Sequence, residues 1–222
     1  MPATPRDIPA ATVARLPVYL RALHEIARSG GSRVSSGQLA AASGVLASQL
    51  RKDLSHLGSH GVRGVGYAVG LLIAELTAAL GLTRTWPVAI IGMGNLGRAL
   101  AAYSGFATEG FDVVALLDRD PAIVGEVISD LPVRAVDELP TLVPALGIAI
   151  GVIATPAASA QEVADALVAA GVHAVLTFAP TPLHVPGGVS VRRVDLATDL
   201  HVLAFLRQQD RLLPADDVGR AG

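Results

Sequence analysis

The 222-residue sequence contains no cysteine, which excludes disulfide bonds, thiolate metal sites and a cysteine nucleophile. The absence fits a reducing cytoplasm, and this is the compartment that we expect for the protein. Aromatic residues make up only 4% of the chain and charged residues 16%, whereas 51% of the residues are hydrophobic. A disordered chain carries fewer hydrophobic residues, so the sequence predicts a sizeable buried core.

Neither a signal peptide nor a membrane span is indicated. The first 17 residues are interrupted by proline and arginine and contain no apolar core. Residues 139–161 carry no charge and are long enough to cross a bilayer, but Pro140, Pro144 and Pro156 break the stretch. Only residues 148–154 are continuously apolar, which is typical of a buried parallel strand. We therefore expect no membrane partner.

Charge is divided unevenly along the chain. Residues 1–84 carry a formal charge of +5, and residues 85–222 carry −7. The length allows two small domains. A small basic module joined to a larger acidic one suggests a polyanionic partner at one end of the chain. The alternative is a chance distribution of surface charge.

The basic half has the pattern of a helix-turn-helix. Apolar residues at spacings of three and four in residues 13–26 predict a first helix, which Pro17 should kink or restart. Ser35 and Gln38 have the spacing of a capping box, so a short helix should begin there. After a glycine turn, a further helix is expected at about residues 46–57.

These features predict a winged helix DNA-binding domain over residues 1–84, with the helix-turn-helix at about 17–57 and a glycine-rich wing at about 58–67. The residues at about 46–57 include side chains that can donate to phosphates and base edges. The predicted DNA contacts are Ser48, Gln49, Arg51, Lys52, Ser55, Arg63 and Gly64. The alternative is a solvated helix face on which Asp53 pairs with a lysine or an arginine.

The acidic half opens with an apolar strand at residues 88–91, which leads into a Gly-x-Gly-x-x-Gly motif and a helix at about 96–107. The glycines allow a tight turn and a close backbone approach to a pyrophosphate. Asp118 follows a second strand and lies 21 residues after the last glycine of the motif, where it would bind a ribose hydroxyl. This carboxylate favours NAD over NADP because it would repel a 2′-phosphate, although the neighbouring Arg119 could accommodate that phosphate.

Further strands are expected at residues 133–136, 148–154, 174–178 and 189–194, with a helix at 160–170. This alternation predicts an α/β fold, a Rossmann domain with a doubly wound parallel sheet over residues 85–210. It should end in a helix at about 197–208, and residues 211–222 should form a disordered tail. The predicted cofactor-binding residues are Gly92, Met93, Gly94, Asn95, Leu96, Gly97, Asp118, Thr155, Pro156, Ala179 and Pro180. The last four of these residues follow strand ends, where ligands of such sheets bind. Proline is also common after strands that bind no ligand.

No catalytic residue and no metal site are expected. A dehydrogenase needs a substrate domain and a proton donor, whereas the sheet uses nearly all of residues 85–210. His173, His184 and His201 are each better interpreted as structural or solvent-exposed. We therefore expect the dinucleotide to be sensed rather than consumed. The alternative is a small NAD-dependent oxidoreductase with an N-terminal helical dimerisation module.

Several motifs follow one another in a specific order. They lie at residues 14–21, 34–36, 51–55, 63–67, 92–100 and 194–196. From residue 8 to about 209 the sequence resembles the bacterial redox-sensing transcriptional repressors of the Rex family. The resemblance implies a homodimer that binds operator double-stranded DNA and releases it when NADH occupies the Rossmann domains. It also implies that the last helix is exchanged between subunits and that a signal-transfer triad falls on Arg15, Tyr103 and Asp195.

NADH and NAD+ carry the same pyrophosphate, so contacts to it cannot distinguish them. The nicotinamide is neutral in NADH and cationic in NAD+. We expect an apolar pocket at a dimer contact to penalise the cation by desolvation.

Overall fold

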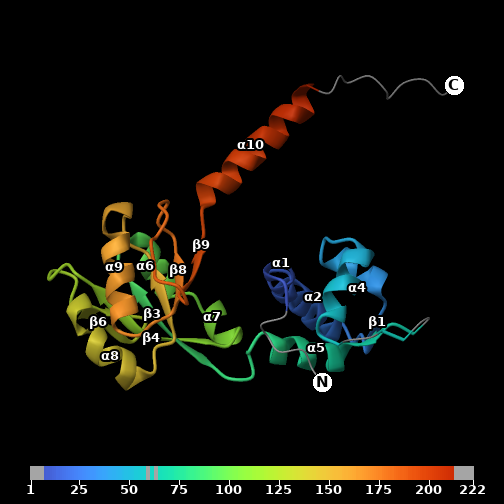
Figure 1. Cartoon of the computed structure of the whole chain (residues 1–222), viewed down its shortest axis with the longest axis horizontal. Coiled ribbons are helices and arrows are strands. Elements are labelled where there is room, and N and C mark those ends of the chain that lie inside the picture. The colour runs from blue at the N-terminus through green and yellow to red at the C-terminus, as the bar shows by residue number, and fades with distance from the viewer. Residues whose placement is uncertain (1–7, 59–60, 63–64, 213–222) are drawn as a thin grey trace. The chain divides into compact units, whose positions relative to one another are not determined.

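A computed structural model describes residues 8–58, 61–62 and 65–212 of the chain (Figure 1). The chain divides into two compact units, Met1–Thr85 and Trp86–Gly222. None of the helices within the described residues is long and apolar enough to cross a membrane. The fold class predicted from the sequence, a winged helix-turn-helix followed by a Rossmann domain, is confirmed.

The first unit contains five helices and a two-stranded antiparallel sheet within the described residues. These elements are α1 (Ala10–Val13), α2 (Leu16–Arg28), β1 (Arg33–Val34), α3 (Ser36–Ala42), α4 (Ala47–Ser55), β2 (Tyr67–Ala68) and α5 (Val69–Ala79). Pro17 lies in the first turn of α2, so the helix restarts there as predicted. The capping box is also confirmed, because Ser35 and Gln38 exchange side-chain and backbone hydrogen bonds at the start of α3.

The wing returns to β1 through a close contact at Gly66. Val34 pairs with Tyr67, and a Cβ on Gly66 would lie 2.3 Å from the carbonyl oxygen of Val34. Gly66 also has a φ of +80°, which strongly favours glycine. The predicted DNA contacts Arg63 and Gly64 lie outside the described residues.

A buried carboxylate joins the first helices to α4. Asp53 is 1% exposed and accepts five hydrogen bonds. Arg15 donates two of them at 2.7 Å, and the Tyr19 hydroxyl donates one at 2.7 Å. The Thr12 hydroxyl and the Gln49 amide nitrogen each donate one at 2.9 Å. The carboxylate therefore fixes α4 against α1 and α2.

The same contacts decide the ionisation of Asp53. Burial by itself raises the pKa of this carboxyl, but the hydrogen bonds from Arg15, Tyr19, Thr12 and Gln49 outweigh burial and hold the pKa well below its usual value of 3.8. Burial, together with the hydrogen bond to Asp53, raises the pKa of Tyr19 to about 12. Asp53 is therefore an anion and Tyr19 a neutral donor at neutral pH.

The second unit is built on a seven-stranded sheet. Its strands are β3 (Trp86–Ile91), β4 (Phe111–Asp118), β5 (Val127–Ile128), β6 (Leu131–Ala135), β7 (Ile150–Ile153), β8 (Ala174–Thr177) and β9 (Ser190–Arg193). They lie in the order β5-β6-β4-β3-β7-β8-β9. All neighbouring pairs are parallel except β5 with β6. The chain thus reverses its direction of winding between β3 and β7, which is where ligands of such sheets bind.

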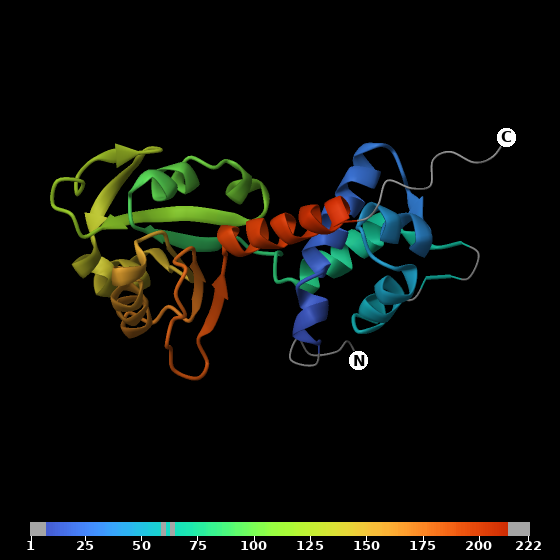
Figure 2. The same ribbon diagram turned by 90° about the horizontal axis from the view of Figure 1, so that it is seen from above.

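Helices cover both faces of this sheet. They are α6 (Asn95–Ala101), α7 (Gly105–Thr108), α8 (Leu139–Leu146) and α9 (Ala157–Ala169), with a 3-10 turn, η2 (Val136–Glu138), before α8. Helix α10 (Leu196–Leu212) follows β9, and its side chains in residues 196–209 are exposed. Ala89 and Ile91 of β3 pack in one core with α8 and α9, whereas Val88 and Ile90 pack in a second core with Leu100 of α6. Figure 2 shows α6 and α7 (green) on one face and α8 and α9 (yellow to orange) on the other.

Some element predictions need correction. The single helix predicted at about 96–107 is wrong, since α6 ends at Ala101 and α7 follows as a separate short helix. Ser104 lies between the two helices and Gly105 begins α7, and both are weak helix formers. Helix α8 was not predicted because of its prolines, but Pro140 lies in its first turn, where a missing N–H costs little. The last helix runs to Leu212, past its predicted end at about 208, and residues 213–222 of the predicted tail lie outside the described residues.

The low pKa of Asp53 predicts how stability depends on pH. Since this pKa lies below its unfolded value of 3.8, the stabilisation is fully present above that value and is lost as pH falls through the folded value. We expect Asp53→Asn to destabilise the first unit at pH 7, because Arg15 loses its counter-ion. The variant should also show a shallower loss of stability between about pH 5 and pH 2 than the parent protein.

Urea unfolding and amide hydrogen exchange in α4 measure both effects. Asp112→Asn, which neutralises an exposed carboxylate on β4, is the matched control. An identical pH slope in the parent protein and Asp53→Asn would contradict the assignment.

Candidate functional site

The three glycines of the loop after β3 are required for three different reasons. Gly92 has a φ of +100°, and a Cβ there would lie 2.7 Å from the Thr155 side chain. A Cβ on Gly97 would lie 1.8 Å from the Gly92 carbonyl oxygen, so α6 packs directly against the loop. A Cβ on Gly94 would meet nothing within 4 Å. Two glycines therefore shape the loop, and the middle one leaves open space beside it.

Asp118 ends β4 next to this loop. One of its carboxylate oxygens accepts the backbone N–H of Met93 at 2.6 Å, and the other accepts that of Asp120 at 2.9 Å. Each carboxylate oxygen can accept a further hydrogen bond. The acid is therefore held at the edge of the loop and can still accept from a ligand hydroxyl.

A cavity of about 630 Å³ brings the loop, the acid and the end of β7 together. Of the residues predicted to bind a cofactor, it is lined by Gly92, Gly94, Asn95, Leu96, Asp118, Thr155 and Pro156. Met93 is fully buried in the core, and Gly97 packs behind the loop. Ala179 and Pro180 are not among the residues that line the cavity.

The cavity also contains residues that the sequence did not single out. Ile123 and Val136 supply apolar surface, and Ser159 and Glu162 come from the first turns of α9. The position of Pro156 was the available signal, because a helix that starts directly after a strand end presents its first turns to the same site.

The lining fits a dinucleotide. The Thr155 hydroxyl is buried and has no hydrogen-bond partner among the described residues, and Thr155 is one of the residues that line the cavity. An unsatisfied buried hydroxyl costs about 1–3 kcal/mol, so a polar ligand group there would be favoured. The open side of Gly94 and the acceptor at Asp118 supply the approach and the ribose contact that such a ligand needs.

Electrostatics at the cavity disfavour a 2′-phosphate. Among the described residues that line it, Arg119 is the one cation, and Asp118, Asp120, Asp137 and Glu162 are carboxylates. The Arg119 guanidinium lies 3.7 Å from Glu162 in an exposed ion pair. The surplus of negative charge supports the interpretation of Asp118 as a residue that favours NAD over NADP.

A second candidate site lies on the outer face of α4. Ser48, Arg51, Lys52 and Ser55 recur at helical spacing and are all exposed, whereas Leu50, Asp53 and Leu54 face the core. Gln49 lies at the margin between the two faces and is half-buried. The outer face therefore carries two cations and two hydroxyl groups.

The role of Asp53 was missed at the sequence level, where it was considered only as a surface partner for a lysine or an arginine. A signal was available, because Asp53 has the helical phase of the core residues Leu50 and Leu54. An acid in that phase is expected to be buried with several donors around it.

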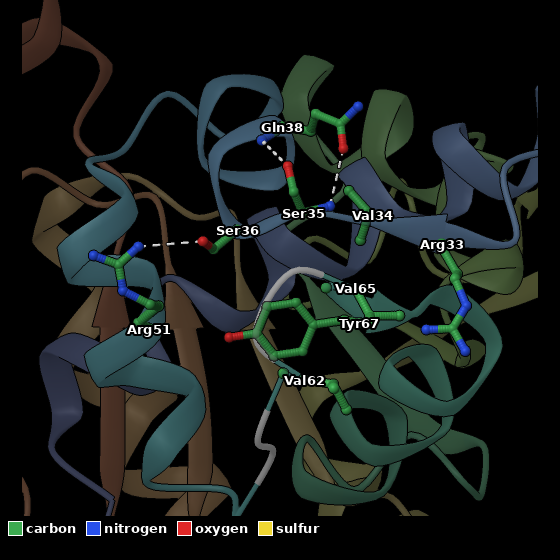
Figure 3. A pocket seen from close by; sticks show the side chains of 11 residues that line it. Arg33, Val34, Ser35, Ser36, Gln38, Arg51, Val62, Val65 and Tyr67 are labelled. Carbon is green, nitrogen blue, oxygen red and sulfur yellow. Dashed lines mark hydrogen bonds between the residues drawn. The ribbon is translucent and has the colours of Figure 1, made fainter.

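A groove of about 580 Å³ runs between α3, α4 and the wing (Figure 3). Arg51 lines it and donates to the Ser36 hydroxyl at 3.2 Å. Figure 3 shows the Tyr67 ring between Arg51 on one side and Arg33 on the other. Two cations and two serine hydroxyls around a groove are suited to phosphate groups. Arg33 and Ser36 were not predicted, because they come before the helix that carries the other contacts.

The three residues of the predicted signal-transfer triad each have a partner within their own unit. Arg15 is paired with Asp53, as described above. Tyr103 is 59% exposed and contacts Phe106 edge to face, with ring centroids 5.2 Å apart. Asp195 accepts hydrogen bonds from the backbone and hydroxyl of Thr198 at the start of α10, and these bonds lower its pKa. The triad stays a prediction.

Comparisons with known proteins match both units. Residues 7–55 match the family described as putative DNA-binding protein N-terminus, and residues 83–181 match the CoA binding domain family. The redox-sensing transcriptional repressor Rex of Streptomyces avermitilis is 56% identical over 204 residues, which are 92% of this chain and 81% of the relative. Rex of Carboxydothermus hydrogenoformans is 46% identical over 203 residues, which are 91% of this chain and 98% of the relative.

Solved structures agree with this result. RSP, a Rex-family repressor, in complex with NAD+ and operator DNA has a TM-score of 0.86 and 37% identity, covering 92% of this chain and 94% of that chain. RSP in complex with NADH has a TM-score of 0.84 and 36% identity, covering 93% of this chain and 97% of that chain. Both units, their order and the sequence identity thus lead to one conclusion: the chain belongs to the Rex family of redox-sensing transcriptional repressors.

Proposed function

We propose that this protein is a homodimeric repressor that binds operator DNA and releases it when NADH occupies the Rossmann unit. One observation carries the proposal: a single chain joins the cationic outer face of α4 to a glycine-loop cavity that fits a dinucleotide. RSP, its relative, has been crystallised with NADH and with NAD+ plus operator DNA. The cytoplasm, where operator DNA lies, is the proposed compartment.

The DNA contacts that we propose divide into two kinds. Arg51 and Arg33 would bind phosphates from the groove beside the wing, and Lys52 would bind a phosphate from α4. Ser48 and Ser55 would face the base edges from the same helix. Phosphate contacts give affinity without sequence preference, whereas contacts to base edges give the preference.

NADH and NAD+ would share the cavity of the Rossmann unit. Gly94 would give the pyrophosphate access to the backbone, Asp118 would accept a ribose hydroxyl, and Thr155 would bond a polar group of the ligand. None of these contacts distinguishes the two redox states. The uncharged nicotinamide of NADH would be favoured by an apolar environment, and the cation of NAD+ would be penalised there.

Helix α10 supports the dimer. Its side chains from Leu196 to Gln208 are all exposed, including the large apolar residues Leu200, Leu203 and Phe205. A contiguous apolar surface of this kind is typical of a protein–protein contact. We propose that a second copy of the chain covers it.

NADH can shift DNA binding only by its differential affinity for the two dimer shapes, typically about 1–3 kcal/mol. The direct experiment is fluorescence anisotropy of a labelled upstream duplex bound to the protein, titrated with NADH and with NAD+. NADH should release the DNA at lower concentration than NAD+. Steady-state oxidation of NADH with carbonyl substrates and no effect on DNA would instead favour the oxidoreductase alternative.

A pair of glycine variants tests the cofactor site. Gly94→Ala places a methyl group in open space at a φ of −69°, so stability should stay unchanged, while NADH binding should weaken by about tenfold or more. Gly97→Ala should destabilise the Rossmann unit by about 1–3 kcal/mol, because its Cβ meets a carbonyl oxygen. Calorimetric titration with NADH and thermal unfolding measure the two effects. Full NADH affinity in Gly94→Ala would rule out the proposed approach of the pyrophosphate.

Removal of a cation tests the DNA face. Lys52→Ala should weaken DNA binding on every duplex to a similar extent and reduce the slope of log affinity against log salt by about 1, because one phosphate contact is lost. NADH affinity should be unchanged. Arg192→Ala, which removes an exposed cation from β9, is the matched control and should leave the slope unchanged. A Lys52→Ala slope equal to that of the control would contradict the assignment of α4.

A further test concerns the predicted signal-transfer triad, and a substitution of Asp195 is easier to interpret than one of Arg15. Arg15→Ala would also leave Asp53 buried without its main partner, whereas Asp195→Asn removes a charge and keeps a side chain that can cap α10. If Asp195 couples the cofactor state to the DNA state, NADH should still bind this variant, but its effect on operator affinity should shrink. An unchanged coupling free energy would eliminate the triad.

A further inference from the structure

Gln49 has a constraint that the other exposed side chains of α4 lack. Its amide nitrogen donates to Asp53 at 2.9 Å, one helical turn further along α4. Asp53 also binds Arg15 and is ionised at neutral pH, so its carboxylate accepts hydrogen bonds and cannot donate them. The nitrogen of the Gln49 amide must therefore be the atom that faces Asp53.

The oxygen of the same amide is left for solvent. Within the described part of the chain, the buried side-chain polar atoms without a partner are the hydroxyls of Ser43 and Thr155, so the Gln49 oxygen is not buried and unpaired. No protein group donates to it among the described residues. Because Gln49 lies at the margin of the outer face, beside Lys52, this oxygen is available to a ligand on that face.

Bases in the major groove differ in what they offer to such an oxygen. Adenine presents the N6 amino group and cytosine the N4 amino group, and both are donors. Guanine and thymine present only acceptors on that edge, and an amide oxygen cannot bond to them. A glutamine that is free to rotate can turn either its oxygen or its amino group to a base. In Gln49 one N–H of the amide is held by Asp53, so the side chain keeps the orientation in which its oxygen is free to accept, and the second N–H is its remaining donor.

We propose that Gln49 is a specificity-determining residue, whose amide oxygen accepts a hydrogen bond from the exocyclic amino group of one major-groove base. Asp53 is the positioning residue that holds the amide in this orientation. The inference rests on the proposed function, since it requires α4 to face DNA. It separates Gln49 from Arg51, whose guanidinium is directed to Ser36 beside the groove and is assigned to phosphate.

The first experiment uses the wild-type full chain without NADH. High-affinity sites are selected from a randomised duplex library, and each adenine or cytosine of a selected site is then replaced by purine or 2-pyrimidinone, which lack the exocyclic amino group. One position in each half-site should lose affinity by about threefold to tenfold, which is the value of a single hydrogen bond. The two replacements distinguish adenine from cytosine as the base that is bound.

The second experiment repeats this scan with Gln49→Met, which keeps the length of the side chain and removes both polar atoms. The cost of the amino deletion at that position should disappear, and the costs at other positions should remain. Gln161→Met, which makes the same change on α9 of the Rossmann unit, is the matched control and should keep the wild-type profile. In Asp53→Asn, whose neutral amide can donate as well as accept, the preference should relax to include guanine or thymine.

The outcomes separate the two levels of the proposal. If the wild-type protein selects no sequence, the proposed function itself fails. If it selects sites but no amino group matters, or if Gln49→Met keeps the wild-type profile, the proposed function stands and the assignment of Gln49 is overturned. A Gln49-dependent preference for guanine or thymine in the wild-type protein would also overturn the assignment of Gln49, because Gln49 would then contact the base through its amide nitrogen.

Discussion

The buried carboxylate of Asp53 is the interaction on which the DNA-binding unit depends. A buried charge is tolerated only when hydrogen bonds replace the water that it has lost. Asp53 obtains five, from Thr12 of α1, Arg15 just before α2, Tyr19 of α2 and Gln49 of α4. Helix α4, which we propose presents side chains to DNA, is thereby attached to the rest of its unit by directional contacts as well as by apolar packing.

In the first unit a buried charge holds the helices together, whereas in the Rossmann unit close backbone packing at glycines shapes the site. Gly97 brings α6 into contact with the loop, and Gly92 turns the chain beneath Thr155. What remains is a cavity with an open approach at Gly94, a fixed acceptor at Asp118 and a hydroxyl that lacks a partner. In both units the polar side chains are held in place before a ligand binds, which reduces the conformational entropy that binding would otherwise cost.

The features that the sequence predicted well are those with a local signature. The glycine loop, Asp118 and the Ser35 capping box each depend on spacing within one segment, and the structure places them as expected. What was missed depends on contacts between distant segments. The helical phase of Asp53 indicated that it is buried, but spacing within α4 could not identify its partners outside this helix, which lie 34 to 41 residues away. Helix α8 was missed because both of its prolines were treated as helix breakers, whereas Pro140 lies in the first turn and the helix contains Pro144 in its interior.

The central claim is that the cofactor cavity and the DNA-binding face are coupled. Thermodynamic linkage requires the coupling to be reciprocal. The factor by which NADH lowers the affinity for operator DNA must therefore equal the factor by which operator DNA lowers the affinity for NADH. The direct measurement is calorimetric titration of the full-length protein with NADH, in the absence and in the presence of a saturating operator duplex. The NADH dissociation constant should rise by about 5- to 150-fold when DNA is bound. The same constant with and without DNA would contradict the coupling.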